Sequence, residues 1–317
     1  MMATVPVRSF GPITVVPGSD GSRFPFCTTL FIDDQVKAVI DPGAGIKALR
    51  SLREKASIDL VLNTHYHFDH IAFNYLFDTA RILINEREAE CFRDRRRIGA
   101  LLGMTEVYGG QWVDGWLERI ASPDTAQSPY SPQNNHKWWR STARLDGTYA
   151  GGDVMHFGTV AMHVIDTPGH SAGFCCLSFP EYGVVYTGDF DLTDFGPWYG
   201  GTDGDIDLFI ASARKIGALD ADWFITGHEK GIVSGDEFRK KLDMFLRKID
   251  ERDHKILACL DRPKGVDEIA RCGVIYHNRL HVDAWIYMWN LIMVKKHLRR
   301  LLQQGRIVEA DDKYVAA

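Results

Sequence analysis

Several common features of protein chains are absent from this sequence of 317 residues. No stretch approaches the roughly 18 consecutive apolar residues that a membrane-spanning helix needs, so we expect no membrane partner. Residues 1–17 lack the charged segment, apolar run and small-residue cleavage site of a secretory signal. Internal repeats and low-complexity tracts are also absent, so a repeat architecture is not expected. These absences predict a soluble, globular protein of the cytoplasm.

CxxC cysteine motifs and a strong net charge are also missing. The six cysteines include no CxxC pair, and a chain of this length does not depend on disulfides for stability. We therefore predict six reduced thiols, in keeping with a cytoplasmic location. The formal net charge of -5 gives little attraction for nucleic acid or for an anionic membrane.

Short apolar runs that alternate with helical patterns are present along most of the chain. We predict strands at 28–32, 36–40, 58–63, 81–84, 154–157, 160–165, 174–179, 184–187 and 223–226. Helical patterns occupy 46–55, about 70–77, 206–219 and 237–252. This order is typical of a layered α/β domain.

Two segments depart from that pattern. Residues from about 86 to 152 hold scattered glycine, proline, serine and aromatic residues, and we interpret them as an irregular insertion that covers the active site as a lid. The tail has helical patterns at 255–260, 266–270 and 282–302, followed by a hairpin pattern at 305–309 and 311–315. We therefore predict a catalytic domain at 1–235 and a small helical, winged-helix-like domain at 236–317.

The most informative motif is the run from His65 to His70, directly after the predicted buried strand at 58–63. Imidazole and carboxylate groups suit zinc, iron or manganese. Alternate residues at a strand end project to the same side, so His65 and His67 can meet one ion. Asp69 and His70 lie in the turn that follows and can face a second ion. A single histidine is more often an ordinary core or surface residue, but this cluster indicates a metal site.

Three later residues can complete the ligand sets. His170 follows a predicted strand in a glycine-flanked loop, Asp189 ends another strand, and His228 ends a third. Each lies at the C-terminal end of a strand, where it opens into a loop. Any one of these positions is weak evidence by itself, but together with the first cluster they predict two metal ions.

The ordered set HxHxDH, His, Asp and His resembles the metallo-β-lactamase superfamily in its glyoxalase II-like form, over about residues 28–230. The resemblance implies an α/β fold, a four-layer αβ/βα sandwich with two ions at one edge. It assigns His65, His67 and His170 to the first ion, Asp69, His70 and His228 to the second, and Asp189 to both. Asp41 matches a family aspartate that orients the metal-binding loop from behind the ligands, although it fits a simple turn residue as well. The tail resembles the winged-helix domain behind some lactamase-like hydrolases.

The resemblance also implies a reaction. Two divalent cations, with zinc as the first choice and iron or manganese as alternatives, would produce a bridging hydroxide that attacks an acyl carbonyl. Asp69 would orient that hydroxide or receive its proton. The substrate would be a small acyl molecule, namely a thioester or a related ester or lactone. Aromatic side chains offer a pocket for the acyl group, unless they only pack the insertion: Trp112, Trp116, Phe195, Trp198 and Tyr199.

Two other functions stay open at this point. An iron-dependent sulfur dioxygenase occurs on the same fold and would need one iron ion. A nucleic-acid-processing metallohydrolase is suggested by basic residues near the last predicted helix, although a basic solvent-facing surface is the more ordinary interpretation. These basic residues are Lys295, Lys296, Arg299, Arg300 and Arg306. Aromatic residues in the tail also leave a homodimer contact open.

Overall fold

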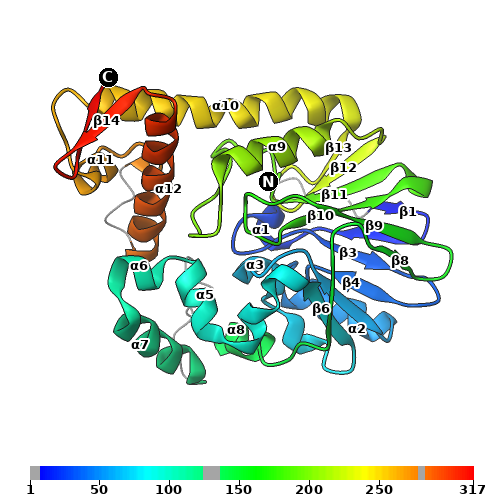
Figure 1. The fold of residues 1–317 in the computed structure, drawn as a ribbon. Coiled ribbons are helices and arrows are strands. Elements are labelled where there is room, and N and C mark those ends of the chain that lie inside the picture. Colours follow the sequence, from blue (N-terminus) through cyan, green and yellow to red (C-terminus); the bar gives the residue numbers. More distant parts are fainter. Residues whose placement is uncertain (1–7, 124–135, 278–282) are drawn as a thin grey trace.

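The computed structural model describes residues 8–123, 136–277 and 283–317. Two β-sheets lie face to face in it, with helices on both outer faces (Figure 1). The first sheet has seven strands in the order β1-β2-β3-β4-β5-β6-β7. The strands from β1 to β4 pair antiparallel, and those from β4 to β7 pair parallel. Their bounds are β1 (Arg8–Phe10), β2 (Ile13–Val16), β3 (Thr29–Ile32), β4 (Ala38–Ile40), β5 (Leu60–Asn63), β6 (Arg81–Asn85) and β7 (Gly147–Tyr149).

The second sheet has six strands in the order β13-β12-β11-β10-β9-β8. Only the β11–β12 pair is parallel among its described pairings. The bounds are β8 (Val154–His156), β9 (Ala161–Asp166), β10 (Cys175–Phe179), β11 (Val184–Gly188), β12 (Trp223–Thr226) and β13 (Ile232–Ser234). Because β9 and β11 both pair antiparallel with β10, the C-terminal ends of β9, β11 and β12 lie at one edge.

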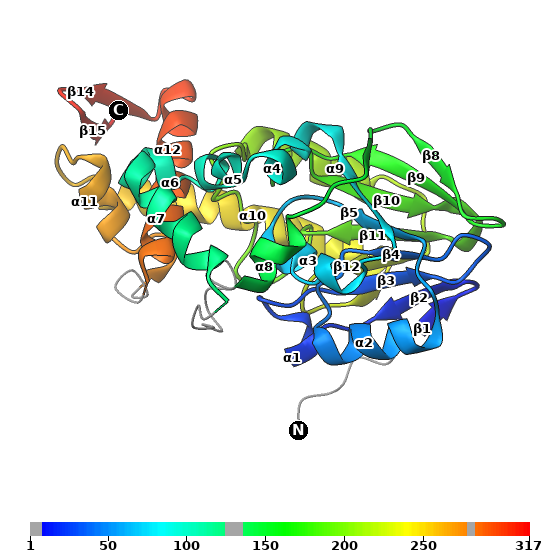
Figure 2. The same cartoon turned by 90° about the horizontal axis from the view of Figure 1, so that it is seen from below.

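Side chains alternate between the two faces of each strand, so each sheet has an inner face towards the other sheet and an outer face towards helices. One face of each sheet contributes to a shared apolar core, with Leu30 and Leu62 from the first sheet and Val164 and Leu177 from the second. Helix α2 (Ile46–Lys55) covers the outer face of the first sheet through Leu49, as Figure 2 shows from below. Helices α9 (Ile206–Gly217) and α10 (Gly235–Cys259) cover the outer face of the second. The predicted four-layer αβ/βα fold is confirmed.

The insertion is more regular than its sequence indicated. The expectation of an irregular segment was wrong, because the described parts form α4 (Glu90–Arg93), α5 (Arg95–Leu101), α6 (Met104–Tyr108), α7 (Gly110–Ala121) and α8 (His136–Ser141). Val113, Trp116 and Ile120 of α7 recur at helical spacing and are buried together. Trp116 and the residues buried with it therefore form the inner face of a helical layer. Residues 124–135, a part of the predicted insertion, lie outside the described residues.

The tail contains helices and a hairpin in the predicted order. Helix α10 runs without a break to its end, where a separate helix at 255–260 was expected. The elements α11 (Val266–Arg271), α12 (Ala284–Gln303), β14 (Ile307–Ala310) and β15 (Lys313–Ala316) follow. One apolar cluster joins Phe224 of the second sheet to Ile269, Leu298 and Ile307 of the tail. The boundary near residue 235 and the winged-helix assignment stay predictions.

Cysteine pairing differs from the expectation. A disulfide joins Cys259, at the end of α10, to Cys272, just after α11, so the prediction of six reduced thiols was wrong for this pair. The chain turns back between the two helices and brings their Cα atoms to 6.7 Å, a separation that a disulfide can span. The other four cysteines are buried free thiols, and they include the predicted core pair Cys175 and Cys176. No helix among the described residues is long and apolar enough to cross a bilayer.

Candidate metal centre

The residues predicted as metal ligands meet at one edge, where the ends of strands from both sheets face each other. The run from His65 to His70 follows β5, and His170 follows β9. Asp189 follows β11, and His228 follows β12. Strands fix the positions of these loops because their backbones are tied into the sheets, while the loops themselves leave the side chains free to converge.

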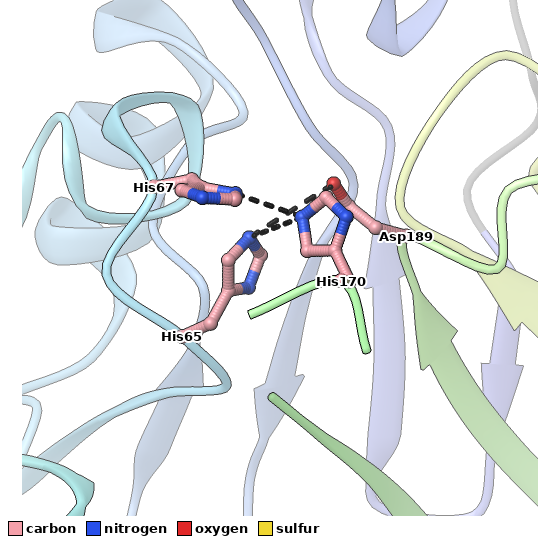
Figure 3. A group of neighbouring side chains, drawn as sticks. All are labelled: His65, His67, His170 and Asp189. Atoms are coloured by element: carbon pink, nitrogen blue, oxygen red, sulfur yellow. Dashed lines mark hydrogen bonds and ion pairs between the residues drawn. The ribbon is translucent and has the colours of Figure 1, made fainter. Parts of the chain in front are cut away.

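Four residues form the first cluster: His65, His67, His170 and Asp189 (Figure 3). Nδ1 of His67 lies 2.8 Å from Nε2 of His170, which lies 3.2 Å from Nε2 of His65. Oδ2 of Asp189 lies 2.9 Å from the same Nε2 of His170. Three ring nitrogens and a carboxylate oxygen therefore point at a common centre. This donor set suits a zinc, iron or manganese ion, which would replace nitrogen–nitrogen contacts by coordination bonds.

The second cluster contains Asp69, His70 and His228. Oδ2 of Asp69 lies 3.1 Å from Nε2 of His228 and 3.7 Å from Nε2 of His70. The second carboxylate oxygen of Asp189, Oδ1, lies 2.8 Å from Nε2 of His70 and 3.6 Å from Nε2 of His228. Asp189 therefore directs one oxygen to each cluster, which is the arrangement that a carboxylate bridging two ions requires.

Hydrogen bonds on the outer nitrogens orient three of the histidines. Nδ1 is the outer nitrogen in each, and its acceptor is a carboxylate or a backbone carbonyl oxygen. In a neutral imidazole this leaves Nε2 without a proton and able to bind a metal. The pairs are His70 with Asp41 Oδ2 at 2.8 Å, His228 with Ser22 O at 2.9 Å, and His170 with Trp198 O at 2.8 Å.

Asp41 connects three segments behind the ligands. Its side chain is fully buried, and its backbone has a left-handed φ of 48° in the turn after β4. The carboxylate accepts hydrogen bonds from both N and Oγ1 of Thr64, each at 2.7 Å, and from Oη of Tyr186 at 3.1 Å, besides the one from His70. These bonds fix the loop after β5 relative to β4 and β11.

Burial sets the charge of the first cluster. Both His65 and His67 are buried, and removal from water lowers the pKa of each imidazole well below its usual value of 6.5, assisted by the neighbouring histidines. Neutral imidazoles offer lone pairs, so these two side chains are ready to bind a metal at neutral pH.

The predicted pocket residues fall in two places. Trp198 lies at the first cluster, with its ring centroid 5.0 Å from that of His67 and 5.4 Å from that of His170. Its neighbour Tyr199 is fully buried, and its hydroxyl lies 2.7 Å from Nε2 of His297. Phe195 is 37% exposed and packs on the tail. These three belong to the loop after Asp189, and Trp198 forms one wall of the metal site.

Trp112 and Trp116 lie in the helical insertion instead. Their ring centroids are 5.7 Å and 6.0 Å from that of Trp285, which belongs to α12. Trp116 is fully buried in this cluster. Packing between the insertion and the tail accounts for these two contacts.

Three of the basic residues near the last helix interact within the molecule: Lys295, Lys296 and Arg300. Nζ of Lys295 lies 2.6 Å from Oε1 of Glu106, and Nζ of Lys296 contacts the carbonyl oxygens of Gly201 and Gly204. Arg300 has three aspartates within 3.8 to 3.9 Å: Asp207, Asp250 and Asp253. Positive charge that is neutralised inside the fold attracts phosphate weakly.

Two carboxylates beside the ligand-bearing loops were missed by sequence reasoning, Glu88 and Asp203. Glu88 is 1% exposed, and burial raises the pKa of its carboxyl to about 8. Burial likewise raises the pKa of Asp203. Neither belongs to a histidine-rich motif, so no sequence signal distinguished them from surface acids.

Family comparison agrees with this geometry. The model of the metallo-beta-lactamase superfamily matches residues 23–90 and 113–228, more than half of the chain, and the chain belongs to this superfamily. The matched residues include the ligands of both clusters.

Individual relatives match in part. An acyl-coenzyme A thioesterase, MBLAC2, of Bos taurus is 28% identical over 165 residues, which cover 48% of this chain and 53% of the relative. A hydroxyacylglutathione hydrolase of Brucella ovis is 39% identical over 88 residues, which cover 27% of this chain and 33% of the relative. The match therefore spans about half of the first relative and a third of the second.

Solved structures match the whole fold. A metallo-beta-lactamase family protein of Thermus thermophilus aligns with a TM-score of 0.66 at 18% identity, over 97% of this chain and 99% of that one. A beta-lactamase domain protein of Burkholderia ambifaria gives 0.67 at 18% identity, over 100% and 96%. Since the alignments extend through the tail, the fold of the entire chain has precedents.

Proposed function

We propose that this protein is a dinuclear metal-dependent hydrolase that cleaves thioesters or related acyl esters and lactones. The observation that carries the proposal is the position of Asp189, whose two oxygens face two separate groups of metal-binding side chains. A single-ion site would not need a carboxylate placed in this way. Zinc is the first choice of metal for this histidine and aspartate set.

The chain's own residues have distinct roles in such a reaction. Two bound divalent cations would supply activated water and polarise the acyl carbonyl. We assign to Asp69, which lies within the second cluster, the role of accepting a proton from the attacking water. Trp198 packs against His67 and His170 and excludes water from one side of the site.

The substrate class rests on the relatives. Acyl-coenzyme A and hydroxyacylglutathione, which appear in the names of two relatives, are both thioesters. Similarity to both supports thioester cleavage as the first activity to examine.

The test is a panel of substrates with metal content measured in parallel. Full-length protein would be assayed for thiol release from acyl-coenzyme A and acylglutathione, and for opening of lactones. We expect activity with about two metal ions bound, its loss on chelation and in Asp189→Asn, and its retention in Asp220→Asn, a matched control on an exposed loop. Fully metallated protein with no turnover across the panel would overturn the proposal. One iron ion per chain with oxygen uptake on a persulfide would replace it by the dioxygenase alternative.

A further inference from the structure

A buried carboxylate that is not a candidate ligand joins the two loops of the first metal cluster. Glu88 lies in a short turn, Glu86–Glu88, directly after β6. One loop carries His65 and His67 and follows β5, and the other carries His170 and follows β9. Their relative position determines how well the three histidines surround one ion.

Each oxygen of Glu88 serves one of these loops. Oε2 accepts a hydrogen bond from the backbone N of Tyr66, at 2.6 Å, and Tyr66 lies between His65 and His67 in the sequence. Oε1 accepts from the backbone N of Gly173, at 3.0 Å, and from Oγ of Ser171. Ser171 directly follows His170, so the carboxylate connects the immediate neighbours of the ligands.

The surroundings are built to admit this carboxylate. A Cβ atom at Gly173 would lie only 2.6 Å from Cγ of Glu88, so the close approach depends on glycine at this position. A second, partly buried carboxylate joins the same loops, because Asp203 accepts from Oη of Tyr66 at 3.2 Å and from N of Ala172 at 3.1 Å. Burying an acid is costly for a fold, and Glu88 is only 1% exposed between these loops.

The second cluster shares the loop after β5 with the first, but its two histidines have supports of their own. His70 is held by Asp41, and His228 by the carbonyl oxygens of Ser22 and Phe26. A change at Glu88 should therefore alter the two metal sites unequally.

We propose that Glu88 is a positioning residue for the first metal site: it sets the spacing of the His65–His67 and His170 loops and thereby the affinity for the first ion. This inference rests on the proposed function only in that the protein binds two metal ions. Loss of an outer partner of metal ligands commonly weakens binding about 10- to 100-fold, and we expect that range here.

The test measures zinc affinity in the full chain by competition with a chromophoric chelator. Glu88→Gln keeps the shape of the side chain but replaces one accepting oxygen by an amide nitrogen, which cannot accept from Tyr66 N or Gly173 N. Glu86→Gln is the control, on the exposed residue of the same turn. We expect Glu88→Gln to weaken one of two zinc sites by about 10- to 100-fold and to leave the other unchanged. In an Asp69→Asn background, which disables the second site, the remaining zinc site should weaken to the same degree. The absorption spectrum of cobalt at that site should also change.

Milder loss of the same contact gives an independent check if Glu88→Gln folds poorly. Ser171→Ala removes one hydrogen bond to Glu88, for which we expect about a five-fold weaker first site. Unchanged zinc affinity in both variants, or equal weakening of both sites, would overturn the positioning role. Failure of the thioester assay with selective zinc weakening would overturn only the proposed substrate, because the metal titration uses no substrate.

Discussion

Replacing Asp41 by asparagine examines the support of the second metal site. The two side chains have almost the same shape, so the change removes charge and one acceptor without opening a cavity. In the protein, Oδ1 accepts from N of Thr64, and Oδ2 accepts from Oγ1 of Thr64, Nδ1 of His70 and Oη of Tyr186. An amide nitrogen cannot accept from any of these donors.

Two magnitudes follow from that geometry. If the amide nitrogen replaces Oδ2, Nδ1 of His70 loses its acceptor in a fully buried position, whereas Oη of Tyr186 keeps an acceptor in O of Thr28 at 2.9 Å. An unsatisfied buried donor costs about 1–3 kcal/mol, so the free energy of unfolding should fall by about 1–3 kcal/mol. His70 also loses the partner that orients it, and affinity for the second ion should fall about 10- to 100-fold, which corresponds to about 1.4–2.8 kcal/mol.

Urea unfolding of chelated protein and competitive zinc titration of the full chain measure these two quantities. Asp220→Asn is the matched control, since Asp220 is exposed. In protein whose first site is disabled by His170→Ala, only the second site remains. We expect Asp41→Asn to weaken zinc binding at that remaining site. Zinc binding and stability that both equal those of the control would refute the assigned role of Asp41.

Three further predictions concern stability. Gly169→Ala should destabilise the protein by about 1–3 kcal/mol in urea unfolding, because the φ of Gly169 is +129° and the new Cβ would lie 2.2 Å from a backbone nitrogen of α9. Gly110→Ala is the control and should be neutral, because its Cβ would meet no atom within 4 Å. Equal effects of the two changes would contradict the steric reasoning. Cys259→Ser should lower the free energy of unfolding by about 3 kcal/mol, since the disulfide to Cys272 closes a loop with a sequence separation of 13. A thermal unfolding curve of the wild-type protein that does not change with reductant would count against this contribution of the disulfide. Burial raises the pKa of Glu88 from an ordinary 4.5 to about 8, because the fold favours the protonated side chain. The contribution of Glu88 to the free energy of unfolding is therefore present below pH 4.5. It is lost as pH rises towards 8, at up to about 1.4 kcal/mol per pH unit. In chelated protein, wild type should therefore lose stability relative to Glu88→Gln over that window, and a pH-independent difference in urea unfolding would exclude the shift.

Short apolar runs and helical patterns made much of the fold predictable from the sequence. Helix α2 begins and ends at the predicted residues, and the central strands agree within a few positions, because their buried faces require continuous apolar patterns. The missed strands β1, β7 and β13 lie at sheet edges and have only three residues each, and the missed strand β2 has four, too few for a periodic signal. The helical insertion was missed because glycines at 103, 109 and 110 interrupt its pattern.

The candidate site shows the same division. His65, His170 and Asp189 could be proposed from the sequence because each follows an apolar strand, and such strand ends meet at one edge of the fold. Glu88 could not, because two of its three partners are backbone groups 22 and 85 residues away, and a backbone donor leaves no trace in residue identity. Supporting contacts of this kind depend on the tertiary structure.

The apolar cluster that joins the second sheet to the tail has a consequence for folding. Helix α10 buries Phe238 and Ile249 along one face, and the same cluster continues into α11, α12 and β14. A chain ending near residue 235 would expose this surface of the sheet to water. We therefore expect the tail and the second sheet to unfold in a single cooperative transition, so that the tail contributes to the rigidity of the edge on which the metal-binding loops stand.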